Sequence, residues 1–169
     1  MHAMRRLVPA DLDPVLAVYR DAVISQCPNL YSPDQIKAWA QHPERNDTVR
    51  LALLRGFGLV SLGSEPSGTI EAFGLLDPTD RLSLLYCRGR STRQGRANAL
   101  LASLEAHAAG QGCPVLRTEA SQLSKPLLLR RGWQVEAEEE VIFAANLFRR
   151  WRMIKPLTTA ASPPTAPHG

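Results

Sequence analysis

The chain has 169 residues, of which 44% are hydrophobic and 21% charged, and these proportions fit one globular domain with a core of its own. Its apolar runs fall short of the roughly 20 residues that a membrane-spanning helix needs, so we expect no membrane partner. The net charge of +4 is mildly basic, which suits either an anionic ligand or nucleic acid.

The cysteines and the amino terminus bear on the compartment. Cys27, Cys87 and Cys113 are odd in number and follow neither a disulfide nor a metal-binding spacing. We interpret them as buried or idle thiols in a reducing compartment, and we expect no metal. The segment 1–6 leads directly into folded-looking sequence with no signal peptide, so we expect a cytoplasmic location.

The first half of the chain predicts a strand, two helices and a series of strands. The first strand is expected over 5–9, and a helix follows from Asp11. A second helix begins at Ser32-Pro33-Asp34-Gln35, which combines a capping box with proline in the first helical position. Runs typical of strands then cover 51–54, 58–62, 69–76 and 81–87, and we interpret them as an antiparallel meander.

The second half of the chain places helices between further strands. Small and apolar residues at helical spacing over 97–108 predict a central helix that ends at Gly110-Gln111-Gly112. We then expect a strand over 115–121, a short helix over 125–131, and strands over 133–135, 141–143 and 145–155. Residues 1–157 are therefore predicted to form one α+β domain, a mostly antiparallel sheet flanked by helices. The proline-rich segment 158–169 is expected to be a disordered tail.

The strongest candidate site is the turn between the strand 81–87 and the central helix. A helix start carries backbone N–H groups without helical partners and the positive end of the helix dipole, so it attracts anions. Gly95 lets the backbone approach a phosphate closely, and four arginines (Arg88, Arg90, Arg93 and Arg96) surround the turn. A solvated surface loop is the alternative. The residues expected to hold a diphosphate are Thr92, Arg93, Gln94, Gly95, Arg96, Ala97 and Asn98.

The segment 92–97 resembles the acetyl-CoA loop of the GNAT superfamily of acetyltransferases. That loop reads Gln/Arg-x-x-Gly-x-Gly/Ala after a strand ending in Leu-Tyr-Val, and Leu85-Tyr86-Cys87 stands at the strand end here. The segment 118–133 resembles a further GNAT stretch. Small single-domain bacterial members are resembled by 19–23, 31–35 and 152–157, so the likeness covers about 5–157. Thr92 departs from the usual Gln/Arg, and we expect it to weaken phosphate binding without abolishing it.

The resemblance implies an acetyl-CoA-dependent N-acetyltransferase with a GNAT fold and no metal. Its acceptor would be an amine of a small molecule or of a protein. The pantetheine arm of the coenzyme is expected to pair with the backbone at the end of the strand that holds Leu85 and Cys87. Tyr31 and Trp39 are expected on the acceptor side, which the first two helices line in relatives. Plain core packing is the alternative for Trp39.

Three side chains are candidates for catalysis. Glu119 is expected to be the base, because its strand flanks the coenzyme in relatives; the alternative is a carboxylate paired with an arginine. Ser121 could position the thiolate or a water, or cap the following helix. Tyr86 could donate a proton, or pack in the core. No histidine is expected to be catalytic; His42 is assigned to a polar loop and His107 to the outer face of the central helix.

One departure from the family leaves the activity open. Many relatives carry a tyrosine that protonates the leaving thiolate, and Leu127 and Leu128 occupy that place here. The alternative function is therefore a regulatory GNAT-fold module that binds CoA, or a partner, without efficient transfer. We do not expect nucleic acid, because no aromatic residues alternate with the basic clusters. The oligomeric state is open, with a homodimer among the alternatives.

Overall fold

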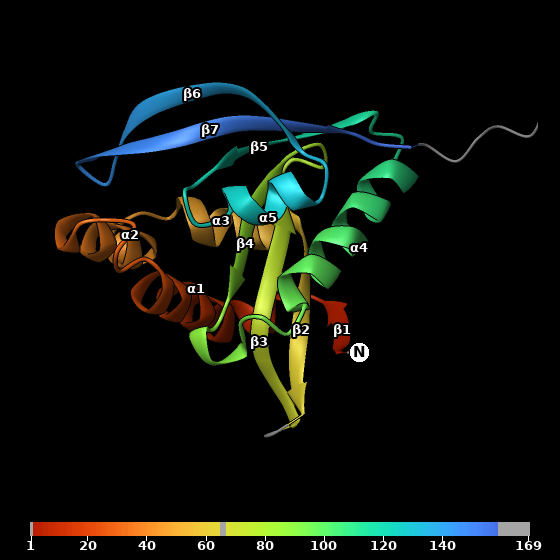
Figure 1. Cartoon of the computed structure of the whole chain (residues 1–169). Coiled ribbons are helices and arrows are strands. Elements are labelled where there is room, and N and C mark those ends of the chain that lie inside the picture. Colours follow the sequence, from red (N-terminus) through yellow and green to blue (C-terminus); the bar gives the residue numbers. More distant parts are fainter. Residues whose placement is uncertain (1, 65–66, 159–169) are drawn as a thin grey trace, which may run out of the picture.

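The computed structural model describes residues 2–64 and 67–158, which form two antiparallel sheets covered by helices (Figure 1). The first sheet has the order β1-β2-β3-β4 and the second the order β5-β7-β6. The strands of the first sheet are β1 (Ala3–Arg6), β2 (Phe57–Ser64), β3 (Ser67–Leu76) and β4 (Leu82–Cys87). Those of the second are β5 (Val115–Ala120), β6 (Gln134–Phe143) and β7 (Asn146–Pro156).

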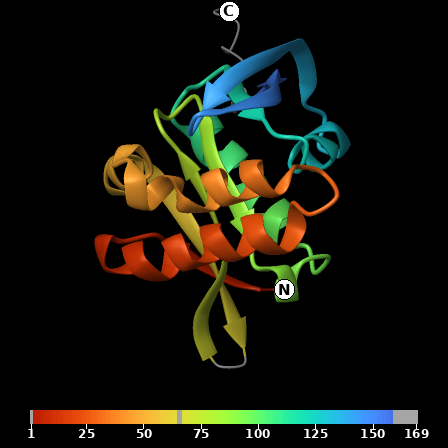
Figure 2. The ribbon, with the colours of Figure 1, turned by 90° about the vertical axis from the view of Figure 1, so that its left-hand side faces the viewer.

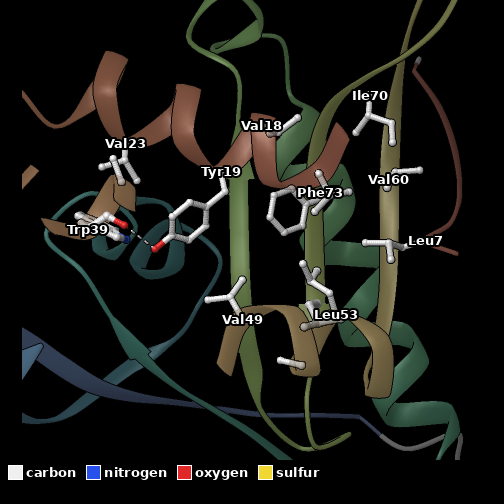
Figure 3. Packing of buried hydrophobic residues seen from close by; sticks show 14 of the residues in the cluster. Leu7, Val18, Tyr19, Val23, Trp39, Val49, Leu53, Val60, Ile70 and Phe73 are labelled. Carbon is white, nitrogen blue, oxygen red and sulfur yellow. Dashed lines mark hydrogen bonds between the residues drawn. The ribbon is translucent and has the colours of Figure 1, made fainter. Parts of the chain in front are cut away.

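Helices cover both faces of the first sheet, so the α+β prediction is confirmed. The helices are α1 (Leu12–Gln26), α2 (Pro33–Arg45), α3 (Thr48–Arg55), α4 (Arg96–Gly110) and α5 (Lys125–Arg130). Figure 3 shows α1 and α3 in front of the first sheet and α4 behind it. Figure 2 shows α1 and α2 lying side by side. In the described segments, no helix has both the length and the apolar composition to cross a membrane.

The buried side chains form a core on each side of the first sheet. The first core lies between the sheet and helices α1 to α3, and it includes Tyr19, Val49 and Phe73 (Figure 3). The second core joins α4 and α5 to the second sheet, and it includes Leu104, Leu128 and Met153. Each core contains residues from both halves of the chain.

Strands β4 and β5 meet at one end and then separate. A parallel bridge joins Arg81 to Arg117, and the Thr118 hydroxyl donates to the Leu82 carbonyl over 2.7 Å. Beyond this point, within 2–64 and 67–158, no bridge connects the rest of β4 to β5. The edge of β4 that faces β5 is therefore left open, and the gap between the strands can admit a ligand.

The prediction of a strand over 51–54 is wrong, because these residues belong to α3. A run of four apolar residues does not by itself distinguish a strand from a helix. Here Ala52 and Leu53 are buried, whereas Leu51 and Leu54 are each 53% exposed, which is the pattern of a helix packed by one face.

Two further boundaries also differ from the prediction. The first strand ends at Arg6 instead of Pro9, which opens a 3-10 turn (Pro9–Asp11). The strands expected over 133–135 and 141–143 are one strand, β6, whose glutamate-rich middle is paired to β7 along its length. The tail expected over 158–169 lies outside the described residues from 159 onward.

His42 lies in α2 instead of a polar loop, because the helix continues through Pro43. A proline inside a helix cannot donate to the carbonyl four residues earlier, which is that of Trp39. The Tyr19 hydroxyl donates to this carbonyl over 3.0 Å and replaces the missing bond (Figure 3). One buried tyrosine on α1 thus allows α2 to extend and to carry His42 toward the interior.

Candidate functional site

The start of α4 presents backbone donors to open space. Gly95 is its N-cap residue in the left-handed conformation, with φ at 79°, and none of the described side chains caps this helix end. The amides of Arg96, Ala97 and Asn98 therefore point out of the helix without helical partners. A Cβ atom built on Gly95 would meet no heavy atom within 4 Å. The geometry is that of an anion site at a helix start.

Three of the four arginines around the turn bond to other parts of the protein through their guanidinium groups. The buried Arg96 guanidinium donates to the Ser61 hydroxyl and the Leu62 carbonyl, each over 3.0 Å. Arg90 binds the Glu71 carboxylate through two bonds of 2.8 Å, and Arg88 donates to the Ile70 carbonyl over 3.0 Å. These three side chains fasten the turn to the sheet. Arg93 is exposed, as are Gln94 and Asn98, whereas Thr92 and Ala97 are half-buried.

Glu71 organises the turn, and the sequence analysis missed it. Its carboxylate on β3 is buried and accepts bonds from Arg90 and, over 2.6 Å, from the Ser91 hydroxyl. Hydrogen bonding by the Arg90 guanidinium lowers the pKa of Glu71 to about 2, against the opposing effect of burial. The signal in the sequence was a single acidic residue inside the apolar run 70–76.

Helix α1 holds the turn from the other side. The Asp21 carboxylate accepts a bond of 2.8 Å from the Gly89 amide. A Cβ atom at Gly89 would lie 2.6 Å from the Ser25 hydroxyl oxygen, so this close approach requires glycine. Side chains from α1 and β3 therefore fix residues 88–91 before any ligand binds.

Two cavities lie on either side of the gap between β4 and β5. The small cavity, of about 130 Å³, extends toward α5 and is lined by residues that include Leu82, Thr118, Ser124 and Leu128. The large cavity, of about 250 Å³, extends toward α1, α2 and the β6–β7 hairpin. Both are bounded by a shared wall, which consists of Trp39, Ser83, Leu84, Tyr86, Glu119 and Ser121. The three side chains expected to be catalytic are all in this wall.

Glu119 is paired with an arginine, as the alternative interpretation anticipated. The Arg81 Nε atom donates to Glu119 Oε2 over 2.9 Å, and both side chains are half-buried. Among the described residues, the Oε1 atom has no hydrogen-bond donor. The ion pair therefore holds the carboxylate in place and leaves one oxygen available to a ligand or a water.

Tyr86 is held by an aromatic neighbour that orients its hydroxyl group. The Trp39 Nε1–H donates to Tyr86 Oη over 3.2 Å, and the Tyr19 ring lies 4.7 Å from that of Tyr86. Burial raises the pKa of Tyr86 well above its ordinary value, so the phenol stays protonated at neutral pH. Because Oη already accepts from Trp39, its own proton can be donated elsewhere.

Ser121 forms a reciprocal pair with Ser124 in the turn before α5. The Ser121 amide donates to Ser124 Oγ over 3.0 Å, and the Ser124 amide donates to Ser121 Oγ over 3.1 Å. Ser121 does not cap α5 as the alternative interpretation expected, because the N-cap residue is Ser124 and no side-chain hydrogen bond among the described residues caps this helix. The pair shapes the turn, yet the Ser121 side chain still borders both cavities.

The end of β4 contains no reactive thiol. Cys87 is buried, and burial raises the pKa of its thiol to about 11, so it is protonated at neutral pH. Its carbonyl accepts a bond of 2.6 Å from Gln26 on α1, while Leu85 packs partly buried against the second core. Leu128, only 1% exposed, presents an apolar side chain to the small cavity.

Aromatic side chains dominate the large cavity. Tyr31 lies 5.3 Å from Trp39 and 5.8 Å from Phe148 between ring centroids, and Tyr31 Oη accepts a bond from the Gln122 amide. His42, which the sequence analysis set aside, lines the same cavity with its ring 4.3 Å from Phe143. Burial lowers the pKa of His42, so its imidazole is neutral at pH 7. Only the continuation of α2 through Pro43 places His42 at this cavity, and the sequence carries no local signal for that continuation.

The comparisons with known proteins agree with this geometry. No protein-family model matches the chain. The chain is 28% identical over 153 residues to the uncharacterized N-acetyltransferase YafP of Escherichia coli (strain K12), covering 88% of this chain and 95% of that protein.

Solved structures share its fold. A GCN5-related N-acetyltransferase from Rhodopseudomonas palustris superposes with a TM-score of 0.87 at 21% identity, covering 93% of this chain and 96% of that one. The PaiA N-acetyltransferase of Thermoplasma acidophilum, solved with coenzyme A, superposes with a TM-score of 0.72 at 18% identity, covering 92% and 99%. The chain therefore has the fold of the GNAT superfamily, and the resemblance found in its sequence is confirmed. Within the described segments, no cluster of three or more metal-binding side chains accompanies this fold.

Proposed function

We propose that the protein is an acetyl-CoA-dependent N-acetyltransferase. The observation that carries this proposal is the start of α4, which no side chain among the described residues caps and which has open space in front of Gly95. The turn that leads to it follows β4, the strand whose edge toward β5 is open. Its similarity to GNAT acetyltransferases, including structures solved with coenzyme A or acetyl-CoA, supports the same assignment.

The hydrogen-bond donors at the start of α4 fit a coenzyme that carries a diphosphate. The amides of Arg96, Ala97 and Asn98 are without helical partners, and the space beyond Gly95 is open. These amides would hold the diphosphate, with Thr92, Arg93 and Gln94 beside it. The backbone of Leu85 and the amide of Cys87, on the open edge of β4, would hold the pantetheine arm, since the Cys87 carbonyl already accepts a bond from Gln26.

Acetyl-CoA, when bound, supplies an acetyl group activated as a thioester. Glu119 would take a proton from the acceptor amine at Oε1, directly or through a water. Tyr86 would donate a hydrogen bond from Oη–H to negative charge that develops near the shared wall. With a pKa far above that of a thiol, its phenol serves as a fixed donor and keeps its proton.

The proposal is tested by acetyl-CoA calorimetry together with release of free thiol in the presence of a mixed panel of amines. We expect saturable binding of acetyl-CoA and thiol release that depends on an amine. Binding without release by any amine would favour the CoA-binding module instead. No binding of either CoA or acetyl-CoA would overturn both assignments.

A further inference from the structure

We propose that the acceptor is a small primary amine on a short arm attached to a flat, uncharged apolar body, such as an aromatic ring. This inference rests on the proposed function and assigns the large cavity as the acceptor site. It excludes protein amino groups, polyamines and free amino acids as good acceptors.

The size of the large cavity limits the acceptor to a small molecule. Its volume of about 250 Å³ is just below the range of roughly 300–1,000 Å³ typical of drug-sized ligands, so it suits one or two rings.

The β6–β7 hairpin reaches over α2 (Figure 1), and its residues Phe143 and Phe148 line the cavity. The Gln35 side chain on α2 donates to the Leu147 carbonyl over 2.8 Å, and His42 packs against Phe143. These contacts hold the hairpin against α2, so the part of α2 beneath the hairpin is not free to bind a polypeptide.

The polarity of the cavity gives the acceptor a direction. Polar side chains lie on the β4 and β5 side, where Ser83, Glu119 and Ser121 belong to the shared wall. Apolar rings lie on the hairpin side, where Phe143 and Phe148 are 5.6 Å apart. An amine directed at Glu119 therefore places its body among aromatic rings, which favour another ring through edge and face contacts.

The charges in the cavity wall are already paired. Three arginines line the cavity, and each has a carboxylate partner: Arg81 with Glu119 at 2.9 Å, Arg149 with Glu138 at 2.9 Å and Arg150 with Glu139 at 2.6 Å. Each of these arginine charges is balanced by a glutamate, which weakens its attraction for a substrate carboxylate. A second ammonium group would find no free carboxylate at the hairpin end. The body of the acceptor is therefore expected to be uncharged.

The test compares four acceptors with acetyl-CoA: 2-phenylethylamine, phenylalanine, spermidine and a tetrapeptide with a free amino terminus. We expect kcat/KM for 2-phenylethylamine to exceed each of the others by at least about tenfold, which corresponds to about 1.4 kcal/mol. Phenylalanine is the sharpest comparison, since it differs only by its carboxylate. Equal or better use of any of the other three acceptors would overturn the proposal.

A pair of variants on one strand locates the binding site. Phe143→Ala should raise KM for 2-phenylethylamine about tenfold and leave the affinity for acetyl-CoA unchanged. Ile142→Ala is the control, because Ile142 is 73% exposed and is not among the residues that line the cavity. A Phe143→Ala variant that melts like the wild type and keeps its KM would contradict the assignment.

Calorimetric titration of 2-phenylethylamine into the protein separates this inference from the proposed function. Binding that Phe143→Ala weakens, without any acetyl transfer, would support the cavity assignment and defeat the enzyme proposal. Acetyl transfer that prefers spermidine or the tetrapeptide would support the enzyme proposal and overturn the assignment of the acceptor. Absence of both binding and transfer of 2-phenylethylamine would overturn the inference.

Discussion

Individual residues at the α4 start combine two properties that the proposed reaction needs. Gly95 adopts a left-handed conformation, with φ at 79°, that few other residues tolerate, and it leaves the space in front of the helix open. The amides that follow it are donors without helical partners, and the exposed Arg93 lies just before them in the chain.

Gly95→Glu is expected to weaken acetyl-CoA binding by at least about tenfold, because a carboxylate would occupy and charge the site meant for phosphate. Calorimetry measures the effect. Gly95→Ala is the matched control: it adds backbone strain of about 1 kcal/mol but no charge. Wild-type affinity in Gly95→Glu would show that the coenzyme binds elsewhere.

Tyr86→Phe should lower kcat by about 100-fold while the dissociation constant for acetyl-CoA stays the same, because it removes one donor from the shared wall. Stopped-flow or steady-state kinetics with a good acceptor would measure the split between kcat and KM. An unchanged kcat would assign Tyr86 to packing alone.

Leu128→Tyr tests whether a second donor can act from the small cavity. A phenol there should raise kcat if it reaches the leaving sulfur and α5 accepts the extra volume. The substitution enlarges a side chain that is only 1% exposed, and overpacking of this kind typically costs about 1–3 kcal/mol. Melting temperature and acetyl-CoA affinity therefore have to be measured beside the rate. A folded, ligand-binding variant that gains nothing would mean that proton delivery does not limit turnover.

At the scale of elements, the turn 88–95 is a scaffold built by its neighbours. Glu71 on β3 and Asp21 on α1 hold it from two sides, and Arg96 anchors the first turn of α4 to β2. The arginines that looked like ligand-binding residues in the sequence mostly provide this support.

Glu71→Gln should therefore destabilise the fold by about 3 kcal/mol at pH 7, since the folded-state pKa of about 2 lies below the ordinary value of 4.5. A depressed pKa stabilises the fold above the ordinary value, and this stabilisation is lost as the pH falls from about 4.5 toward 2. Chemical denaturation between pH 7 and pH 2 should show a flatter acid dependence in the variant. A parallel loss of stability in both proteins would assign the acid sensitivity to other carboxylates.

At the scale of the whole molecule, the two sheets are joined by a short contact at one end of β4 and β5. One hydrogen bond of this contact is donated by the buried Thr118 hydroxyl to the Leu82 carbonyl.

Thr118→Val should lower the free energy of unfolding by about 1–2 kcal/mol, seen as a fall in melting temperature of about 3–6 °C. Thr69→Val is the control, since the Thr69 hydroxyl makes no hydrogen bond with the described residues. Equal effects of the two substitutions would mean that the Thr118 bond contributes nothing specific.

The sequence predicted the architecture and the main loop because these features have local signals. The capping box at 32–35, the helical spacing over 97–108 and the glycine at the α4 start each follow from short-range chemistry. The partners of Arg90 and Arg96 were not predictable, because they lie on strands that are distant in sequence. His42 was missed because the hydroxyl that satisfies the Trp39 carbonyl comes from another helix.

The shared wall has a consequence for the order in which substrates arrive. The small cavity opens toward α5 and the large one toward α2, so each substrate can enter from its own side of the gap while the other remains in place. Cys27 and Cys87 are both buried, and burial raises the pKa of both thiols, so neither is suited to carry the acyl group between two half-reactions. Transfer would then take place directly within a ternary complex, and initial-rate plots against either substrate would intersect instead of running parallel.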